Sequence, residues 1–115
     1  MNFIIRLLLN AVAIYLTASL LPGVAAGDFF DAFILAVVLA ILNSTVKPLF
    51  IILTIPFTIV TLGLFLIVIN AAVILLAAWF VDGIVIDGFW WAVLFGLIVS
   101  ILNSILYGLA GDKSK

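Results

Sequence analysis

The sequence predicts an all-α integral membrane protein of four transmembrane helices, arranged as two tandem helical hairpins that point the same way. Three observations lead to this prediction: the overall composition, an internal repeat, and the positions of the basic residues. Hydrophobic residues make up 70% of the 115 residues, and charged residues only 8%. A water-soluble domain of this size could not remove so much apolar surface from water. We therefore expect one membrane domain over 1–115.

The internal repeat has a period of sixty positions, because Ile41-Leu42-Asn43-Ser44 returns as Ile101-Leu102-Asn103-Ser104. The same shift, without a gap, aligns further identical residues: Asn10 with Asn70, Ala11 with Ala71, Ile14 with Ile74, Leu16 with Leu76, Ala18 with Ala78, Gly23 with Gly83, Phe29 with Phe89, and Ala32 with Ala92. Self-similarity at a fixed period predicts a duplication. Repeat 1 covers about 3–48, repeat 2 about 62–109, and a short tail 110–115 follows.

Four apolar runs are long enough to cross a membrane, since a hydrocarbon core of ~30 Å needs about 20 helical residues. We expect helices over 3–21, 29–46, 62–81 and 89–109. Short links rich in Pro-Gly, Gly-Asp and Asp-Gly join the first helix to the second and the third to the fourth. Such sequences are typical of turns, so each pair should form an antiparallel hairpin.

The basic residues predict the orientation. With four spans, one side of the membrane receives Arg6, Lys47, Lys113 and Lys115, and the other side receives Asp28, Asp31, Asp82 and Asp87. Because basic residues favour the cytoplasmic side, we expect both termini in the cytoplasm.

The N-terminal segment also has features of a cleavable signal peptide: Arg6, an apolar run, and the small residues Val24-Ala25-Ala26-Gly27. The repeat argues against cleavage, because Asn10 and Ile14 recur inside the chain. A leader that is removed has no reason to match an internal span. We therefore interpret the segment as a true first helix.

The segment 48–61 is too apolar for an aqueous loop, yet Pro48 and Pro56 disfavour an uninterrupted helix. Lys47 already lies ~27 Å along the second span at 1.5 Å per residue, close to the membrane edge. We favour an interfacial or re-entrant segment on the cytoplasmic face. The alternative is that spans two and three are long and kinked and meet at Pro56. In both cases Gly63 is the hinge that begins the third span.

Small residues recur at intervals of four in the second and fourth spans, and residues four apart share one helix face. In lipid, such grooves let helices approach closely. We expect them to make these two spans the central packing helices and, because they are duplicated, to support a homo-oligomer. The groove residues are Ala32, Ala36, Ala40 and Ser44, and at the equivalent positions Ala92, Gly96, Ser100 and Ser104.

Each span also carries one asparagine in its cytoplasmic half: Asn10, Asn43, Asn70 and Asn103. An amide in hydrocarbon is costly unless it finds a hydrogen-bond partner, so these side chains should face protein. We favour a role as interhelical hydrogen-bonding groups. A polar lining for a pore or for a lipid head group is the alternative.

The composition argues against an enzyme. There is no cysteine and no histidine, which removes thiolate chemistry, the commonest metal ligand and the usual base for a nucleophilic serine. No phosphate-binding loop or basic nucleic-acid patch is present. We expect no cofactor, no metal, no nucleic acid and no soluble small-molecule substrate, and membrane lipid is the expected partner.

Five stretches of the chain form a recognisable pattern: Leu42-Asn43-Ser44-Thr45-Val46-Lys47-Pro48-Leu49, Leu53-Thr54-Ile55-Pro56-Phe57-Thr58, Thr61-Leu62-Gly63-Leu64-Phe65, Val68-Ile69-Asn70-Ala71 and Gly88-Phe89-Trp90-Trp91-Ala92. With these stretches the chain resembles the small bacterial family called phage holin family 4, the mycobacterial four-span phage holin superfamily IV. The resemblance covers nearly the whole chain. It implies a four-helix protein of the inner membrane, and more weakly a holin-like role.

Three functions follow as hypotheses. The first is holin-like permeabilisation after self-association, which the family resemblance favours. The second is a non-lytic protein that organises membrane, interacts with lipid or takes part in envelope stress, which the apolar middle segment favours. The third is a small transporter of parallel repeats. It ranks last, because no ionisable residue lies at the expected midplane.

Overall fold

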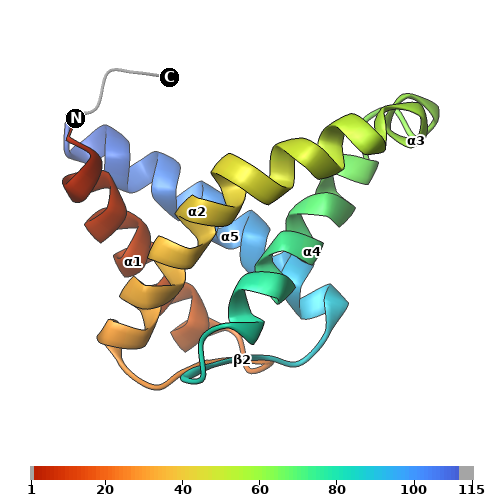
Figure 1. The fold of residues 1–115 in the computed structure, drawn as a ribbon. Helices are drawn as coiled ribbons and strands as arrows, with labels where there is room; N and C mark the ends of the chain where they lie inside the picture. The colour runs from red at the N-terminus through yellow and green to blue at the C-terminus, as the bar shows by residue number, and fades with distance from the viewer. Residues whose placement is uncertain (1, 112–115) are drawn as a thin grey trace.

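The computed structural model describes residues 2–111, which fold into five helices and two very short strands (Figure 1). The elements are α1 Phe3–Leu20, β1 Val24–Ala26, α2 Phe29–Leu53, α3 Ile55–Val60, α4 Phe65–Trp79, β2 Ile84–Ile86 and α5 Phe89–Leu109. Three helices, α1, α2 and α5, are long and apolar enough to cross a membrane, and α4 is a shorter apolar helix. Lys113 and Lys115, used above to predict orientation, lie outside the described residues.

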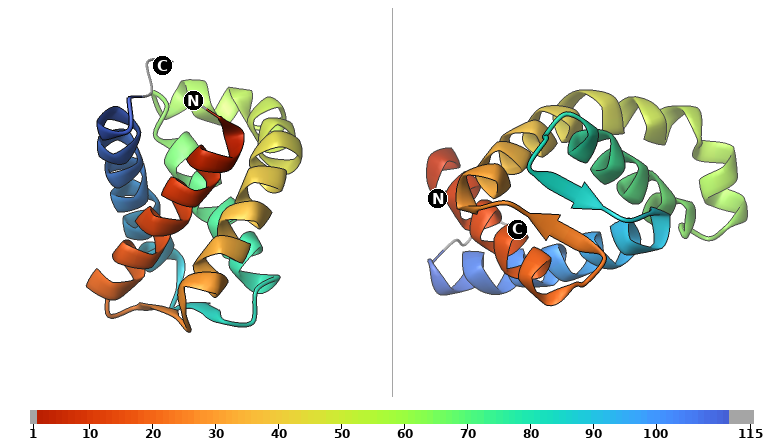
Figure 2. Two further views of the ribbon diagram at one scale, coloured as in Figure 1. Left: turned by 90° about the vertical axis from the view of Figure 1, so that its left-hand side faces the viewer. Right: turned by 90° about the horizontal axis from the view of Figure 1, so that it is seen from below.

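The four long helices form a ring in which each has two main neighbours. Helix α1 packs against α2 and α5, and α4 packs against the same two helices from the opposite side (Figures 1 and 2). The two hairpins therefore meet through α1–α5 and α2–α4 contacts. Helices α2 and α5, expected to be central, occupy positions equivalent to those of α1 and α4.

The helix limits follow from local sequence. The side chain of Asn2 accepts a hydrogen bond from Ile4 N–H at 2.6 Å, and Asp28 Oδ1 accepts one from Asp31 N–H at 3.0 Å. These side chains cap the starts of α1 and α2. Helices α1 and α5 agree with the predicted spans 3–21 and 89–109, because their apolar runs are bounded by turn sequences at both ends.

The second span is longer than predicted, since α2 continues through Pro48 to Leu53 instead of ending near residue 46. A proline within a helix removes one N–H donor and crowds the preceding turn, which bends a helix without necessarily ending it. Pro56 stands in the first turn of α3, where its missing N–H costs no helical bond. The segment 48–61 is thus helical over most of its length. Its position relative to the membrane surface stays a prediction.

The third span starts later than predicted, at Phe65, because a left-handed turn follows α3. Leu62 has φ 59° and Gly63 has φ 91°, and Gly63 N–H donates to Thr58 O at 2.8 Å. This six-to-one bond is characteristic of a Schellman helix end. Gly63 therefore acts at the hinge where the sequence placed it, and Leu62 takes a conformation that is unfavourable for a side chain with Cβ.

The two links predicted as turns contain a two-stranded antiparallel ribbon. Val24 pairs with Ile86, Ala25 with Val85, and Ala26 with Ile84. Two flanking bonds extend the ribbon, from Gly27 N–H to Gly83 O at 2.9 Å and from Asp87 N–H to Gly23 O at 2.8 Å. The ribbon lies across one end of the bundle (Figure 2). It joins the two hairpins and satisfies backbone groups that a bare loop would leave without partners.

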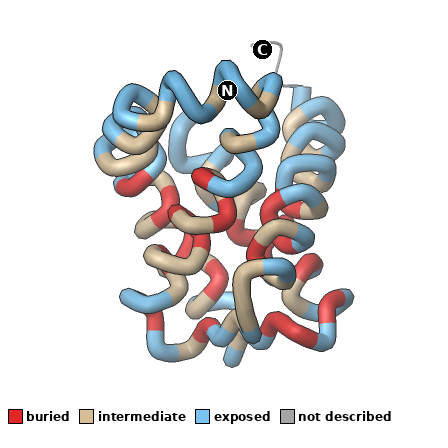
Figure 3. The backbone as a smooth tube through the Cα atoms, turned by 90° about the vertical axis from the view of Figure 1, so that its right-hand side faces the viewer, coloured by how far each residue is buried: buried red, intermediate tan, exposed pale blue. Residues whose placement is uncertain are grey.

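The packed core occupies the middle of the bundle and the half near the ribbon, while the opposite end is more exposed (Figure 3). The largest fully buried side chains are Phe95, Ile14, Leu35, Val73 and Thr17. The Thr17 hydroxyl donates to Ala13 O at 2.7 Å, so this buried polar group is satisfied. Many large apolar side chains point outward, including Leu20 at 68% and Leu109 at 81% exposed. Such a surface suits hydrocarbon and not water.

Two close contacts join the ribbon to the opposite hairpin. A Cβ atom on Gly23 would overlap the indole ring of Trp91, and one on Gly83 would overlap the carboxylate of Asp31. Glycine at these two positions therefore lets α5 pack onto the first link and α2 onto the second.

Replacing Gly23 with alanine should lower the stability of the folded protein by about 1–3 kcal/mol, because Trp91 must move away. Thermal unfolding in detergent, followed by circular dichroism, measures this change. Gly108→Ala is the matched control, since a Cβ there meets nothing within 4 Å and alanine favours a helix. Equal midpoints for Gly23→Ala and the wild type would contradict the contact.

Candidate functional site

A polar cavity of about 190 Å³ lies between the four long helices. Each helix contributes one of the asparagines singled out in the sequence, and Lys47 and Ser100 join them. The lining residues are Asn10, Leu39, Asn43, Lys47, Asn70, Ile74, Phe95, Gly96, Val99, Ser100 and Asn103. Residues distant in the chain thus form one polar site surrounded by an apolar bundle.

Two hydrogen bonds in the cavity join the hairpins to one another. Asn103 Nδ2 on α5 donates to Asn10 Oδ1 on α1 at 2.8 Å. Lys47 Nζ on α2 donates to Asn70 Oδ1 on α4 at 3.0 Å. Three of the four asparagines therefore bond across helices, and Asn43 is exposed at the rim.

Lys47 was expected at the membrane edge and not inside the bundle, because the predicted second span ends one residue before it. With α2 continuing through Pro48, Lys47 lies one turn beyond Asn43 on the same helix face. The spacing of four between Asn43 and Lys47 could have indicated that both side chains face the same site. It was not used, because the proline directly after Lys47 suggested that the helix ends there.

The cavity carries a positive charge that its lining does not neutralise. None of the lining residues is acidic, and the amide partner of Lys47 is neutral. On the same helix Asp31 stands sixteen residues earlier, ~24 Å away at 1.5 Å per residue. A lysine at the centre of a membrane costs about 2.5–3.5 kcal/mol on insertion scales and less toward the surface. The site therefore favours a negatively charged group.

The amides present more free donors than acceptors. The Oδ1 atoms of Asn10 and Asn70 each accept a bond, whereas their amino groups donate to no partner within residues 2–111. The Oδ1 atom of Asn103 is buried and likewise accepts no bond there. The uncommitted N–H groups of Asn10 and Asn70 outnumber this buried acceptor, which again suits an anion.

The small-residue groove divides into a buried half and an open half. Ala32, Ala36, Ala92 and Gly96 are buried inside the single chain. Ala40 is half-buried, and Ser44, Ser100 and Ser104 are exposed. The buried half is used in packing inside the bundle, where Gly96 on α5 meets Asn70 and Ile74 on α4, and it cannot contact a second copy of the chain. Only the exposed half is available for self-association.

Gly96 has a specific role in the cavity wall. A Cβ atom on Gly96 would lie 2.6 Å from Asn70 Nδ2 and 2.9 Å from Ile74 Cδ1. Glycine therefore allows the Asn70 side chain to lie directly against α5, where it meets Lys47.

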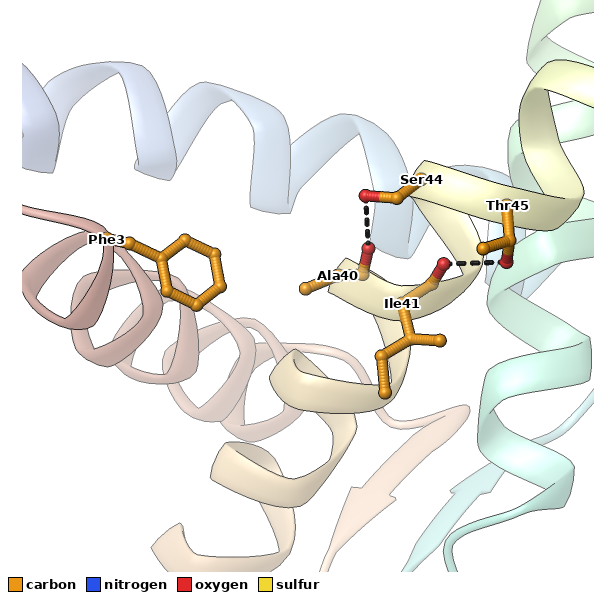
Figure 4. A pocket seen from close by; sticks show the side chains of 5 residues that line it. All are labelled: Phe3, Ala40, Ile41, Ser44 and Thr45. Atoms are coloured by element: carbon orange, nitrogen blue, oxygen red, sulfur yellow. Dashed lines mark hydrogen bonds between the residues drawn. The ribbon is translucent and has the colours of Figure 1, made fainter.

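A second pocket, of about 510 Å³, lies on the outside between the start of α1 and the middle of α2 (Figure 4). Its lining residues are Phe3, Ala40, Ile41, Ser44 and Thr45. The Ser44 hydroxyl donates to Ala40 O at 3.0 Å, and that of Thr45 to Ile41 O at 2.8 Å. Because both hydroxyls bond to their own helix, the pocket presents a mainly apolar wall.

Within residues 2–111 no group of three or more histidine, cysteine, aspartate or glutamate side chains could hold a metal ion. The polar cavity contains amides, an ammonium group and a hydroxyl. These groups can bind and orient a ligand.

Replacing Gly96 with leucine should destabilise the single chain by about 1–3 kcal/mol, because the larger side chain forces Asn70 and Ile74 apart from α5. Gly108→Leu is the control on the same helix, since a Cβ on Gly108 meets nothing within 4 Å and Gly108 is not part of the groove. Thermal unfolding and oligomer size are both measured in detergent. A Gly96→Leu protein with normal stability but altered oligomer size would place this groove between copies instead.

Comparison with known proteins identifies the family. The model for "Mycobacterial 4 TMS phage holin, superfamily IV" matches residues 1–105. Uncharacterized protein SCO3922 of Streptomyces coelicolor is 39% identical over 121 residues, covering 96% of this chain and 97% of its own. Uncharacterized membrane protein YvlD of Bacillus subtilis is 36% identical over 103 residues, covering 89% and 87%.

No solved structure matches the chain at a comparable level of significance. The family match confirms the resemblance carried by the Lys47-Pro48 and Pro56 motifs, and four transmembrane segments agree with three long apolar helices and one shorter helix. The chain is a membrane protein that belongs to the mycobacterial four-TMS phage holin family, superfamily IV.

Proposed function

We propose that this protein is a non-enzymatic, lipid-binding protein of the bacterial inner membrane that does not by itself open the membrane. The observation that carries the proposal is that the polar cavity ends against a packed core. The fully buried side chains of Ile14, Leu35, Val73 and Phe95 fill the bundle, and the ribbon crosses its end. A single chain therefore offers a positively charged binding cavity and no continuous aqueous path.

Holin-like permeabilisation is the second candidate, and membership of the family favours it. Since the bundle of one chain is filled, a pore requires several copies. The surface available for their contact is the exposed half of the groove, including Ser44 and Ser104, together with the apolar pocket beside Phe3. Self-association through this surface belongs to this second proposal.

Both candidates share one architecture, a tandem duplication with hairpins of the same orientation. The strand register supports it, because Ala25 pairs with Val85, its equivalent sixty positions later. The buried positions support it as well, since many recur at the same shift: 11 and 71, 13 and 73, 14 and 74, 17 and 77, 21 and 81, 24 and 84, 32 and 92, 35 and 95, 36 and 96, and 39 and 99. This pattern is expected for two hairpins related by an axis along the membrane normal.

The orientation we propose has both termini in the cytoplasm and the ribbon outside. Arg6 and Lys47 stand toward one end of the bundle, whereas the aspartates at positions 28, 31, 82 and 87 flank the ribbon at the other. The positive-inside rule then directs the Arg6 and Lys47 end inward.

Single cysteines test this orientation, since the natural chain has none. In intact cells a membrane-impermeant maleimide should label Val85→Cys in the exposed part of β2. Asn2→Cys and Ala110→Cys should react only after permeabilisation. The cysteine-free parent is the control. Labelling of Asn2→Cys and Val85→Cys from the same side would overturn the proposed topology.

Induced expression tests the function. We expect cells to keep their membrane potential, measured with a potential-sensitive dye, and we expect the protein to retain phospholipid after extraction into detergent and purification. An abrupt collapse of the potential would favour the holin-like candidate. Protein free of retained lipid would contradict lipid binding.

A further inference from the structure

We propose that the cavity between the four helices binds a phosphate group, supplied by the head group of an anionic phospholipid or by a soluble phosphate ester, and that Lys47 is the residue that recognises it. The proposal rests on the proposed lipid-binding function and assigns it a ligand chemistry and a site.

Charge is the first reason. Lys47 is partly buried, its one hydrogen bond within residues 2–111 goes to the neutral Oδ1 of Asn70, and no acidic residue lines the cavity. An ammonium group in such surroundings is stabilised most by an anion that enters with it. Its three N–H donors exceed the one that Asn70 uses, which leaves two for phosphate oxygens.

The remaining polar groups fit the same ligand. The amino groups of Asn10 and Asn70 are uncommitted donors within the described residues, and Ser100 adds a hydroxyl at the exposed rim. Phosphate oxygens accept from all of these. The buried Oδ1 of Asn103 is an acceptor in need of a donor, a requirement that a hydroxyl of a glycerol head group meets. A halide or a carboxylate would leave this atom without a partner.

The volume of the cavity limits which ligands it can hold. A cavity of about 190 Å³ is smaller than the roughly 300–1,000 Å³ of typical small-molecule pockets. It admits a phosphate with a small substituent, not a whole nucleotide or cofactor. On the same turns of α2, Ala40, Ile41 and Thr45 line the outer apolar pocket (Figure 4). A lipid held by its phosphate thus finds an apolar surface nearby for an acyl chain.

The test compares the wild type with Lys47→Met, which keeps the apolar stem without the charge, and with Lys47→Arg, which restores the charge. Arg6→Gln is the control, because it removes a basic residue that is not part of the cavity lining. Each protein is reconstituted in phosphatidylcholine nanodiscs that contain a minor fraction of phosphatidylglycerol, and retained lipid is identified by native mass spectrometry. In a second arm, inorganic phosphate and glycerol phosphate are titrated against the detergent-solubilised protein and followed by phosphorus NMR.

We expect the wild type, Lys47→Arg and Arg6→Gln to enrich phosphatidylglycerol and Lys47→Met to lose about tenfold in affinity, equivalent to about 1.4 kcal/mol. Binding in the second arm alone, again dependent on Lys47, would identify a soluble phosphate as the source. Ser100→Leu, which narrows the rim, should give the same loss and replaces Lys47→Met if that variant does not fold. Equal binding by the wild type, Lys47→Met and Ser100→Leu overturns the site but leaves lipid binding intact. A wild type that retains no lipid overturns the proposed function as well.

Discussion

Close packing of small side chains between the helices of the bundle is the constraint on which the structure depends. Lipid tails solvate apolar helices as well as a neighbouring helix does, so there is no hydrophobic driving force for association. Helices therefore associate through dense van der Waals contact and interhelical hydrogen bonds. Ala11, Ala32, Ala71 and Ala92 are completely buried, and Gly96 admits the side chain of Asn70 against α5. Only at such short separations can an amide on one helix reach a partner on the next. The apolar groove and the polar cavity are therefore two parts of one packing arrangement.

The sequence was most informative where the membrane dictates structure. Uninterrupted apolar runs bounded by turns define α1 and α5 almost to the residue, and the cost of an unpaired amide predicts that asparagines turn inward. The sequence was least informative about the two short strands. Strands of three residues are too brief to show alternation, and their pairing depends on two links sixty positions apart in the chain.

The cavity was foreseen in part. The four asparagines were identified as a set, but their side chains are neutral amides and do not by themselves indicate an anion. The decisive residue, Lys47, was interpreted as a marker of the membrane edge because a proline follows it. Whether a helix bends or ends at proline depends on tertiary packing around it, and Lys47, one residue before Pro48, hydrogen-bonds to Asn70 on α4. A single sequence does not contain that contact.

The two halves differ at this same position. The equivalent of Lys47 in the second half is Tyr107, which donates to Arg6 O at 3.3 Å and lies under the Arg6 guanidinium, 4.8 Å from the ring centroid to Cζ. In the first half this position places a lysine in the cavity wall, whereas in the second half it places an aromatic ring against the N-terminal arginine. The cavity therefore carries its charge on one side only, next to Asn70 on α4.

The ribbon between the links has a consequence for the origin of the chain. Because its central pair joins equivalent positions, a hairpin encoded alone would meet a second copy of itself in this register, with every bond reciprocated. On the duplication proposed above, this contact would first have been made between two copies of a half-length chain, before fusion placed both copies in one polypeptide.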